Sequence, residues 1–153
     1  MIDTFFIFSA VYLIALPPVV GAFCFFVRPP EDKKLALYFF ILTALFSGVL
    51  GLVTSFFFQN PRPFVSDGII SLIPHEDTNG FPSRHTLSAA YIAAALFPFY
   101  KRTSIFLWVV ALLIGSARVY TGVHHTVDIL GSIVIAAASA GLAWVVLGKF
   151  LKN

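Results

Sequence analysis

The sequence predicts an all-α integral membrane protein, a single bundle of about five transmembrane helices over residues 1–153. Hydrophobic residues make up 59% of the chain and charged residues 11%, whereas a soluble domain carries about a quarter charged residues. Mean hydropathy is +0.92. This composition excludes a water-soluble globular domain, a disordered chain and a nucleic-acid-binding domain. The single cysteine, Cys24, allows no intrachain disulfide.

The first two spans are expected at residues 4–27 and 35–58, joined by a polar turn at residues 28–34. The first run lacks the basic start and short apolar core of a signal peptide. We therefore interpret it as a retained transmembrane helix. Pro17 and Pro18 should kink this helix, which membrane helices tolerate.

Three further spans are expected after a long polar loop at residues 59–84, at about residues 84–100, 103–120 and 127–148. The apolar parts of the third and fourth spans are only 15 residues long. A helix needs about 20 residues to cross a bilayer, so these two spans must include some of their polar flanks.

Five alternating spans divide the ten Lys and Arg residues unequally between the two sides of the membrane. One side holds Arg28, Lys33, Lys34, Lys101, Arg102, Lys149 and Lys152. The other side holds only Arg62, Arg84 and Arg118. Since basic residues favour the cytoplasmic side, we expect the N-terminus outside and the C-terminus inside.

Polar chemistry gathers on the outer side, in the segments 60–63, 81–86 and 118–128. These segments would meet at one end of a helical bundle, although ionisable groups near lipid are costly. Each contributes one of the three outer arginines, whose planar forks suit phosphate oxygens. The helix start in the second segment adds free N–H groups. The pattern indicates a pocket for a phosphate or pyrophosphate group.

His124 and Asp128 are four residues apart, so on a helix start they would share a face. The carboxylate could then hold one ring nitrogen and leave the other free to attack phosphorus. His85 could protonate the leaving oxygen, and the arginines could stabilise the developing charge. This chemistry requires no metal and no other cofactor.

In this pattern the chain resembles the type 2 phosphatidic acid phosphatase family, which shares its site with vanadium haloperoxidases. The family pattern is K-x6-R-P, then P-S-G-H, then S-R-x5-H-x3-D. The matching residues here are Arg62 and Pro63, then Pro82, Ser83, Arg84 and His85, then Arg118, His124 and Asp128. The resemblance covers about residues 55–130.

The resemblance implies that His124 is the nucleophile and forms a phosphohistidine, with Asp128 orienting it and His85 as the general acid. It also implies that the phosphate is held by Arg62, Arg118 and Ser83. A bacterial inner (cell) membrane is then expected, with the site facing the periplasm or exterior. The expected partners are a lipid phosphate or pyrophosphate and membrane lipid, without nucleic acid or an obligate protein partner.

The chain departs from the family pattern at three positions. Ser55 stands where the first motif has lysine, so one phosphate-binding cation is missing. Arg84 replaces a glycine and could supply that charge. Ala117 replaces the serine before the third-motif arginine. Family members more often have six spans than five, so we expect one early helix to be missing.

Several interpretations remain open at this stage. The favoured substrates are undecaprenyl diphosphate or lipid A 1-phosphate, then phosphatidylglycerol phosphate or phosphatidic acid. One alternative is a metal-dependent membrane hydrolase with His85, His124, His125 and Asp128 as ligands, although nearby arginines would repel the cation. Another is a non-catalytic phospholipid-binding or transport protein. A serine hydrolase built on Ser83 is remote, because no G-x-S-x-G motif exists.

The remaining polar residues of the outer side are given structural interpretations. We expect His75, Glu76 and Asp77 to belong to a solvated loop, with headgroup recognition as the alternative. His125 should face solvent or the membrane interface, because neighbouring residues on a helix point in different directions.

Overall fold

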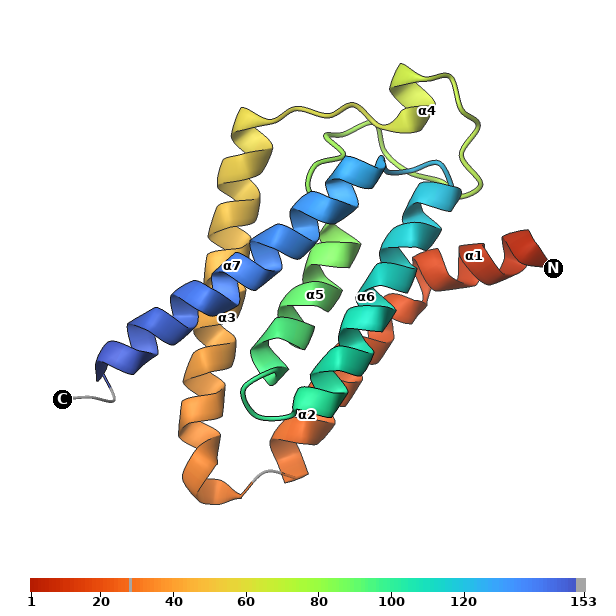
Figure 1. The fold of residues 1–153 in the computed structure, drawn as a ribbon. Coiled ribbons are helices and arrows are strands. Elements are labelled where there is room, and N and C mark those ends of the chain that lie inside the picture. Colours follow the sequence, from red (N-terminus) through yellow and green to blue (C-terminus); the bar gives the residue numbers. More distant parts are fainter. Residues whose placement is uncertain (28, 151–153) are drawn as a thin grey trace.

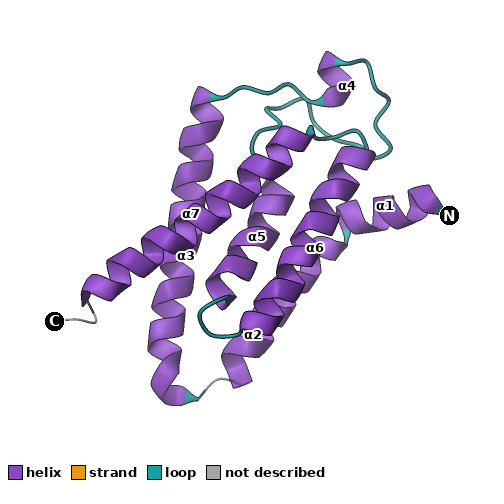
Figure 2. Cartoon of the chain, in the orientation of Figure 1, coloured by secondary structure: helices purple, strands orange, loops and turns teal. Residues whose placement is uncertain are grey.

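The computed structural model describes residues 1–27 and 29–150, which form helices and loops without any strand (Figure 2). In chain order the helices are α1 (Ile2–Val11), the 3₁₀ helix η1 (Leu13–Ala15), α2 (Leu16–Val27), α3 (Pro30–Phe57), α4 (Pro63–Ser66), α5 (Arg84–Leu96), α6 (Lys101–Tyr120) and α7 (Thr126–Phe150). The expected all-α membrane bundle is confirmed. Arg28 and Lys152, two of the seven basic residues assigned to the cytoplasmic side, lie outside the described residues.

Four helical stretches of the described chain are long and apolar enough to cross a membrane. They are Ile2–Val27, Lys33–Phe57, Lys101–Tyr120 and Thr126–Gly148. The remaining long element, α5, has 13 residues and is about 20 Å long, which is shorter than the hydrocarbon core of about 30 Å.

The third span expected from the sequence is therefore longer than the helix, which ends at Leu96. Pro98 explains this difference, because it has no N–H to donate to Ala94 and its ring would clash with that carbonyl. Residues 97–100 instead form a turn, in which the Tyr100 N–H donates to the Leu96 carbonyl at 2.7 Å.

Helix α5 lies at the centre of the bundle and packs mainly against α6 and α7, with α3 and α2 beside it (Figure 1). Five of its alanines are at most 4% exposed: Ala89, Ala90, Ala93, Ala94 and Ala95. Small side chains let helix backbones approach closely. This packing fixes the first turn of α5, and with it Arg84 and His85, at one end of the bundle.

The first expected span is broken into α1, η1 and α2, and α1 runs in a different direction from α2 (Figure 1). The break has a covalent cause, because Pro17 and Pro18 cannot donate the N–H bonds that would continue a helix through this turn. Helix α1 packs against α6, where Phe6 stacks on Tyr120 with ring centroids 4.0 Å apart. The Tyr120 hydroxyl also donates to Asp3 at 2.8 Å.

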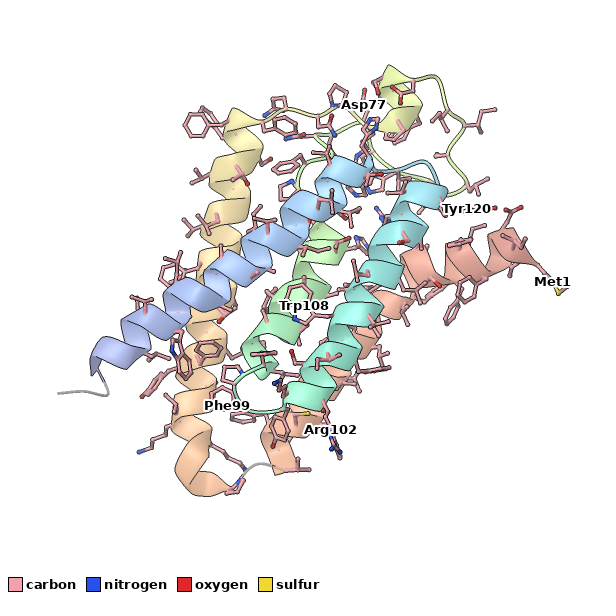
Figure 3. All side chains as sticks on the ribbon, in the orientation of Figure 1. Met1, Asp77, Phe99, Arg102, Trp108 and Tyr120 are labelled. Carbon is pink, nitrogen blue, oxygen red and sulfur yellow. The ribbon has the colours of Figure 1, made fainter. Side chains whose placement is uncertain are left out.

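The long connection at residues 58–83, which contains α4, lies at the same end of the bundle as the turn at residues 121–125 (Figure 1). Asp77 marks this end and Arg102 the opposite end (Figure 3). The connection is held close to α7 at Gly131, where any side chain would overlap the Phe81 ring. The fold thus brings the three polar segments together.

Candidate active site

The central pair of the site is His124 and Asp128, whose Nδ1 and Oδ2 atoms lie 3.1 Å apart. His124 is 2% exposed and Asp128 is fully buried. His124 precedes α7, whereas the sequence argument placed it on the helix itself. Asp128 lies in the first turn of α7 and accepts the backbone N–H of His125 at 2.9 Å. This bond is one half of a helix capping box, and it turns the carboxylate toward His124.

The tautomer of His124 follows from its partners. A carboxylate can only accept hydrogen bonds, so we assign the ring proton to Nδ1, which leaves a lone pair on Nε2. Asn60 Nδ2 donates to Asp128 Oδ1 at 2.7 Å and fixes the second carboxylate oxygen. Burial lowers the pKa of His124 to about 4; the bond to Asp128 opposes this shift, while Arg62 and Arg118 reinforce it. The ring is therefore neutral near pH 7.

Arg62 ties the first and third polar segments together. It is 2% exposed and follows α3 just before α4. Its Nη1 donates to the Val123 carbonyl at 2.8 Å and lies 3.2 Å from His124 Nε2. Its Nη2 reaches Thr78 Oγ1 at 3.4 Å. The guanidinium is thus fixed beside the ring nitrogen that carries the lone pair.

Two buried arginines present hydrogen-bond donors without acceptors in the described part of the protein. These donors are Nε of Arg62 and Nε and Nη2 of Arg118. Arg118, at the end of α6 and 3% exposed, has one weak bond, from Nη1 to the Ala10 carbonyl at 3.4 Å. Leaving a buried charged donor unpaired is costly, so this site is suited to a bound anion.

These groups line a cavity of about 320 Å³ at the loop end of the bundle. Its lining is Ile14, Arg62, His75, Arg84, His85, Ser88, Arg118 and His124. Five of the seven residues singled out in the sequence therefore face one cavity. Asp128 lies behind His124 and does not line it.

Ser83, the seventh, is also fully buried outside the cavity lining. Its hydroxyl accepts a bond from Thr86 Oγ1 at 3.2 Å, and its carbonyl accepts one from Ser132 Oγ at 3.1 Å. Ser83 directly precedes α5, whose first backbone N–H groups have no partner within the helix. In this structure Ser83 therefore anchors the start of α5 to α7.

His75 lines the cavity and differs from the expectation of a solvated loop residue. Its ring centroid lies 6.2 Å from that of His124. Its Nδ1 is 3.2 Å from the Glu76 carbonyl, which leaves Nε2 for other partners. Glu76 and Asp77 are exposed and do not line the cavity. No sequence signal identifies His75, because it lies between motifs in a loop without periodicity.

The other departures from the family pattern have visible partners. Ser55 is outside the cavity lining and accepts a bond from Asn79 Nδ2 at 3.0 Å. Asn79 Oδ1 in turn accepts the backbone N–H of Asn60 at 2.8 Å. Ala117 is fully buried in a cluster with Ala10 and Val123. Position 55 thus supports the loop that holds Asn60.

A metal centre does not assemble from the four residues considered for it. His125 is outside the cavity lining; its Nε2 lies 3.1 Å from the Pro61 carbonyl and its Nδ1 3.9 Å from Asp67. Among the described residues, no group of three or more His, Cys, Asp or Glu side chains could hold a metal ion.

The helical bundle and the arginine-lined cavity define an integral membrane protein with a pocket for an anionic group. Residues 34–152 match the PAP2 superfamily, and the chain belongs to it. The expected family is thereby confirmed, and the chain is a membrane lipid phosphatase of this superfamily.

Two curated relatives come from Bacillus subtilis (strain 168). The chain is 31% identical to undecaprenyl-diphosphatase BcrC over 140 residues, which are 89% of this chain and 70% of that protein. It is 32% identical to phosphatidylglycerophosphatase B over 131 residues, 78% of this chain and 60% of that protein. The chain therefore spans less than two thirds of the second relative's length.

Two crystal structures share the fold. Aquifex aeolicus LpxE matches with a TM-score of 0.75 and 29% identity, over 93% of this chain and 84% of that one. The PAP2 type phosphatidylglycerolphosphate phosphatase from Bacillus subtilis matches with a TM-score of 0.57 and 29% identity, over 97% of this chain and 76% of that one.

Proposed function

We propose that this protein removes phosphate from the phosphate or pyrophosphate group of a membrane lipid through a phosphohistidine on His124. The observation that carries the proposal is the buried pair of His124 and Asp128, 3.1 Å apart, beside arginine donors without acceptors. Undecaprenyl diphosphate and lipid A 1-phosphate are the favoured substrates, ahead of phosphatidylglycerol phosphate and phosphatidic acid. The names of the relatives support this substrate class.

In the first half of the reaction, Nε2 of His124 attacks phosphorus and the bond to the leaving oxygen breaks. Asp128 keeps the proton on Nδ1 and stabilises the positive charge that the ring acquires. Arg118 and Arg62 hold the non-bridging oxygens, where negative charge is concentrated. The N–H groups at the start of α5 add further donors at the same place.

His85 lies in the first turn of α5 and faces the same cavity. It gives a proton to the leaving oxygen when that oxygen would otherwise depart as an alkoxide. The negative charge of the bound phosphate favours the protonated form of the ring. A lipid phosphate leaves as an anion without this proton, and with such a substrate His85 acts in its neutral form throughout. In the second half, neutral His85 takes a proton from water, whose oxygen attacks phosphorus. The N–P bond then breaks, inorganic phosphate is released and free His124 is regenerated.

The lipid chain would leave the cavity along the seam between α2 and α5. Ile14 of η1 and Ser88 of α5 line the polar cavity, and Pro18 of α2 and Ile92 of α5 each lie four residues further along the chain. Both of the latter line an apolar cavity of about 380 Å³ between α2, α3 and α5. We therefore expect an apolar chain attached to a phosphate at His124 to pass from the polar cavity to the apolar one and on into the membrane.

The charge distribution supports an outer-facing site. Lys33 and Lys34 lie near the start of α3, and Lys101 and Arg102 begin α6, at the end of the bundle opposite the cavity (Figure 1). Under the positive-inside rule that end is cytoplasmic. The cavity would then open toward the periplasm or exterior of a bacterial inner membrane, with the N-terminus outside and the C-terminus inside.

The test is phosphate release in detergent with EDTA present, from undecaprenyl diphosphate, lipid A, phosphatidylglycerol phosphate and phosphatidic acid. We expect release by the wild type and none by His124→Ala. Activity that disappears in EDTA and returns with a divalent metal would support the metal-dependent alternative. Binding of these lipids without release by the wild type would support the non-catalytic alternative.

A further inference from the structure

Three arginines line the cavity, and only two of them are buried beside His124. Arg62 and Arg118 are 2% and 3% exposed and lie beside His124. Arg84 also lines the cavity, but it is exposed and begins α5 at the cavity rim. Its guanidinium forms neither an ion pair nor a hydrogen bond with another side chain of the described residues. A cation at the rim therefore remains available to a ligand.

Ser88, which is half-buried, is the polar residue one helical turn after Arg84 in the cavity lining. The two residues are four apart on α5, so they occupy the same helix face about 5–6 Å apart. Both line the cavity, and Ile14 is the apolar residue beside them in the lining. The cavity wall thus offers a guanidinium and a hydroxyl one helical turn apart on α5, and Ile92, one turn further along α5, lines the apolar cavity.

The charge balance of the cavity also indicates that Arg84 is available to a ligand. Three arginines line it, and Asp128 is the carboxylate bonded to its nucleophile. The buried pair of arginines already matches the charge of a single phosphate group, which is close to minus two at pH 7. A second phosphate group adds negative charge, and Arg84 is the arginine of the lining that the first phosphate leaves available to balance it.

We propose that Arg84 and Ser88 form a second phosphate subsite, which makes this protein selective for lipid diphosphates over lipid monophosphates. The terminal phosphate lies at His124 between Arg62 and Arg118. The inner phosphate, which carries the lipid, lies at the rim between Arg84 and Ser88, with the chain entering the seam. Attack at the terminal phosphorus breaks its bond to the bridging oxygen and releases the lipid monophosphate. This subsite rests on the function proposed above.

The experiment compares farnesyl diphosphate with farnesyl monophosphate, which share one apolar chain. Phosphate release is measured in detergent for the wild type, Arg84→Gln, Arg84→Lys and Ser88→Ala, with Arg102→Gln as a matched control. Arg102 is an exposed arginine in the first turn of α6 at the opposite end of the bundle (Figure 3). Thermal unfolding of each variant verifies that it is folded.

We expect Arg84→Gln to lower kcat/KM for the diphosphate by about 10- to 100-fold, the effect of a lost charge-assisted hydrogen bond. For the monophosphate the loss should be less than about fivefold, because only a long-range, solvent-screened attraction is removed. Ser88→Ala should lower the diphosphate value by about two- to tenfold. Arg84→Lys should be intermediate, and Arg102→Gln should match the wild type.

The change in the ratio of the two kcat/KM values is the decisive quantity. A lipid phosphate is intrinsically a better leaving group than an alcohol, so preference of the wild type alone proves nothing. Equal losses on both substrates in Arg84→Gln would overturn the subsite and place Arg84 at the reacting phosphate. Unchanged ratios in both Arg84→Gln and Ser88→Ala would also overturn it. A wild type inactive on both farnesyl substrates and on undecaprenyl diphosphate would instead refute the proposed phosphatase function.

Discussion

At the scale of single residues, Asp128 is the most heavily used side chain of the site. One oxygen faces His124 Nδ1 and the backbone N–H of His125, and the other accepts a bond from Asn60. A fully buried carboxylate is tolerated because all these donors satisfy it. The same bonds fix the tautomer and the orientation of the imidazole.

Asp128→Asn should keep the shape of the side chain and remove its negative charge. The neutral amide can no longer stabilise the positive charge that the His124 ring acquires, and its NH2 group opposes a donor on whichever side it faces. We expect kcat to fall by about 1,000- to 10,000-fold, measured as phosphate release in detergent. Asp67→Asn, at an exposed aspartate near His125, is the control and should retain the wild-type rate. A loss below tenfold in Asp128→Asn would contradict the assigned role.

The pH dependence of kcat/KM tests the state of the nucleophile. Burial and the neighbouring arginines lower the pKa of His124 to about 4, so the lone pair on Nε2 persists well below the usual value of about 6.5. Protonation as the pH falls through 4 would remove that lone pair. We expect the inactivation of the nucleophile on the acid side to have its midpoint below pH 5. A midpoint near 6.5 that is still present in His85→Ala and His75→Ala would contradict this assignment.

Most of the charged residues of the site could be predicted from the sequence, and the ones that could not have a physical reason. The three motifs identified five of the eight cavity-lining residues and the buried pair of His124 and Asp128. For His75 the sequence favoured a solvated loop over the alternative of headgroup recognition, because its place in the cavity depends on long-range contacts that no local pattern encodes. The sequence did not identify Asn60 and Asn79 as supporting residues, because asparagines that form hydrogen bonds of this kind follow no periodic pattern.

At the scale of elements, the contact between α7 and the loop before α5 controls the site. Phe81 packs where Gly131 has no side chain, and the segment it belongs to leads directly into Ser83 and α5. The segment is also held by the backbone bond from Gly80 N–H to the Asn60 carbonyl at 2.8 Å.

Gly131→Ala should therefore cost stability and activity. Its Cβ would overlap the Phe81 ring, and such overpacking costs about 1–3 kcal/mol. Gly141→Ala, in the same helix, is the matched control, because nothing lies within 4 Å of its added Cβ. It should be neutral or stabilise by up to about 1 kcal/mol, since Ala is the better helix former. Thermal unfolding in detergent separates the two, and equal effects would refute the contact.

At the same scale, the apolar seam between α2 and α5 predicts how the enzyme responds to the length of the lipid chain. Gly21 lines the apolar cavity, and a Cβ there would lie 3.2 Å from Ile92. Gly21→Phe should fill this cavity and reduce kcat/KM for undecaprenyl diphosphate by at least about tenfold relative to a short-chain diphosphate. Gly48→Phe, where nothing lies within 4 Å of the added Cβ, should leave the ratio unchanged. The same ratio in both variants would exclude the seam as the path of the chain.

Helix boundaries show where the sequence and the structure differ. Hydropathy alone joins residues 4–27 into one span, but Pro17 and Pro18 separate α1 from α2 through η1. It also extends the third span to residue 100, whereas Pro98 ends α5 at Leu96. Apolar composition therefore predicted which regions are helical, and the prolines determined where the helices end.

At the scale of the whole molecule, the basic residues fall into two groups at opposite ends of the bundle. The end with the long loop holds Arg62, Arg84 and Arg118 around one cavity. The opposite end, which Arg102 marks in Figure 3, holds Lys33 and Lys34 at the start of α3 and Lys101 and Arg102 at the start of α6. Because basic residues favour the cytoplasm, this separation predicts a single orientation in the membrane.

Labelling of intact bacterial cells tests that orientation. Asp77→Cys and Arg102→Cys are introduced separately into Cys24→Ser protein, since Cys24 is the sole native cysteine. A membrane-impermeant maleimide should label the Asp77→Cys protein and leave the Arg102→Cys protein unlabelled until the cells are opened. The reverse pattern would place the cavity on the cytoplasmic side and contradict the proposed topology.

The central claim is that His124 carries the phosphate during turnover, without a metal. The most direct measurement is trapping of enzyme with ³²P-labelled lipid diphosphate in EDTA, followed by an alkaline quench that preserves phosphohistidine and by peptide mapping. We expect label on the peptide that contains His124, absent from His124→Ala and chased by unlabelled substrate. Rapid turnover that leaves no label on this peptide, and that stops when metal is removed, would contradict the claim.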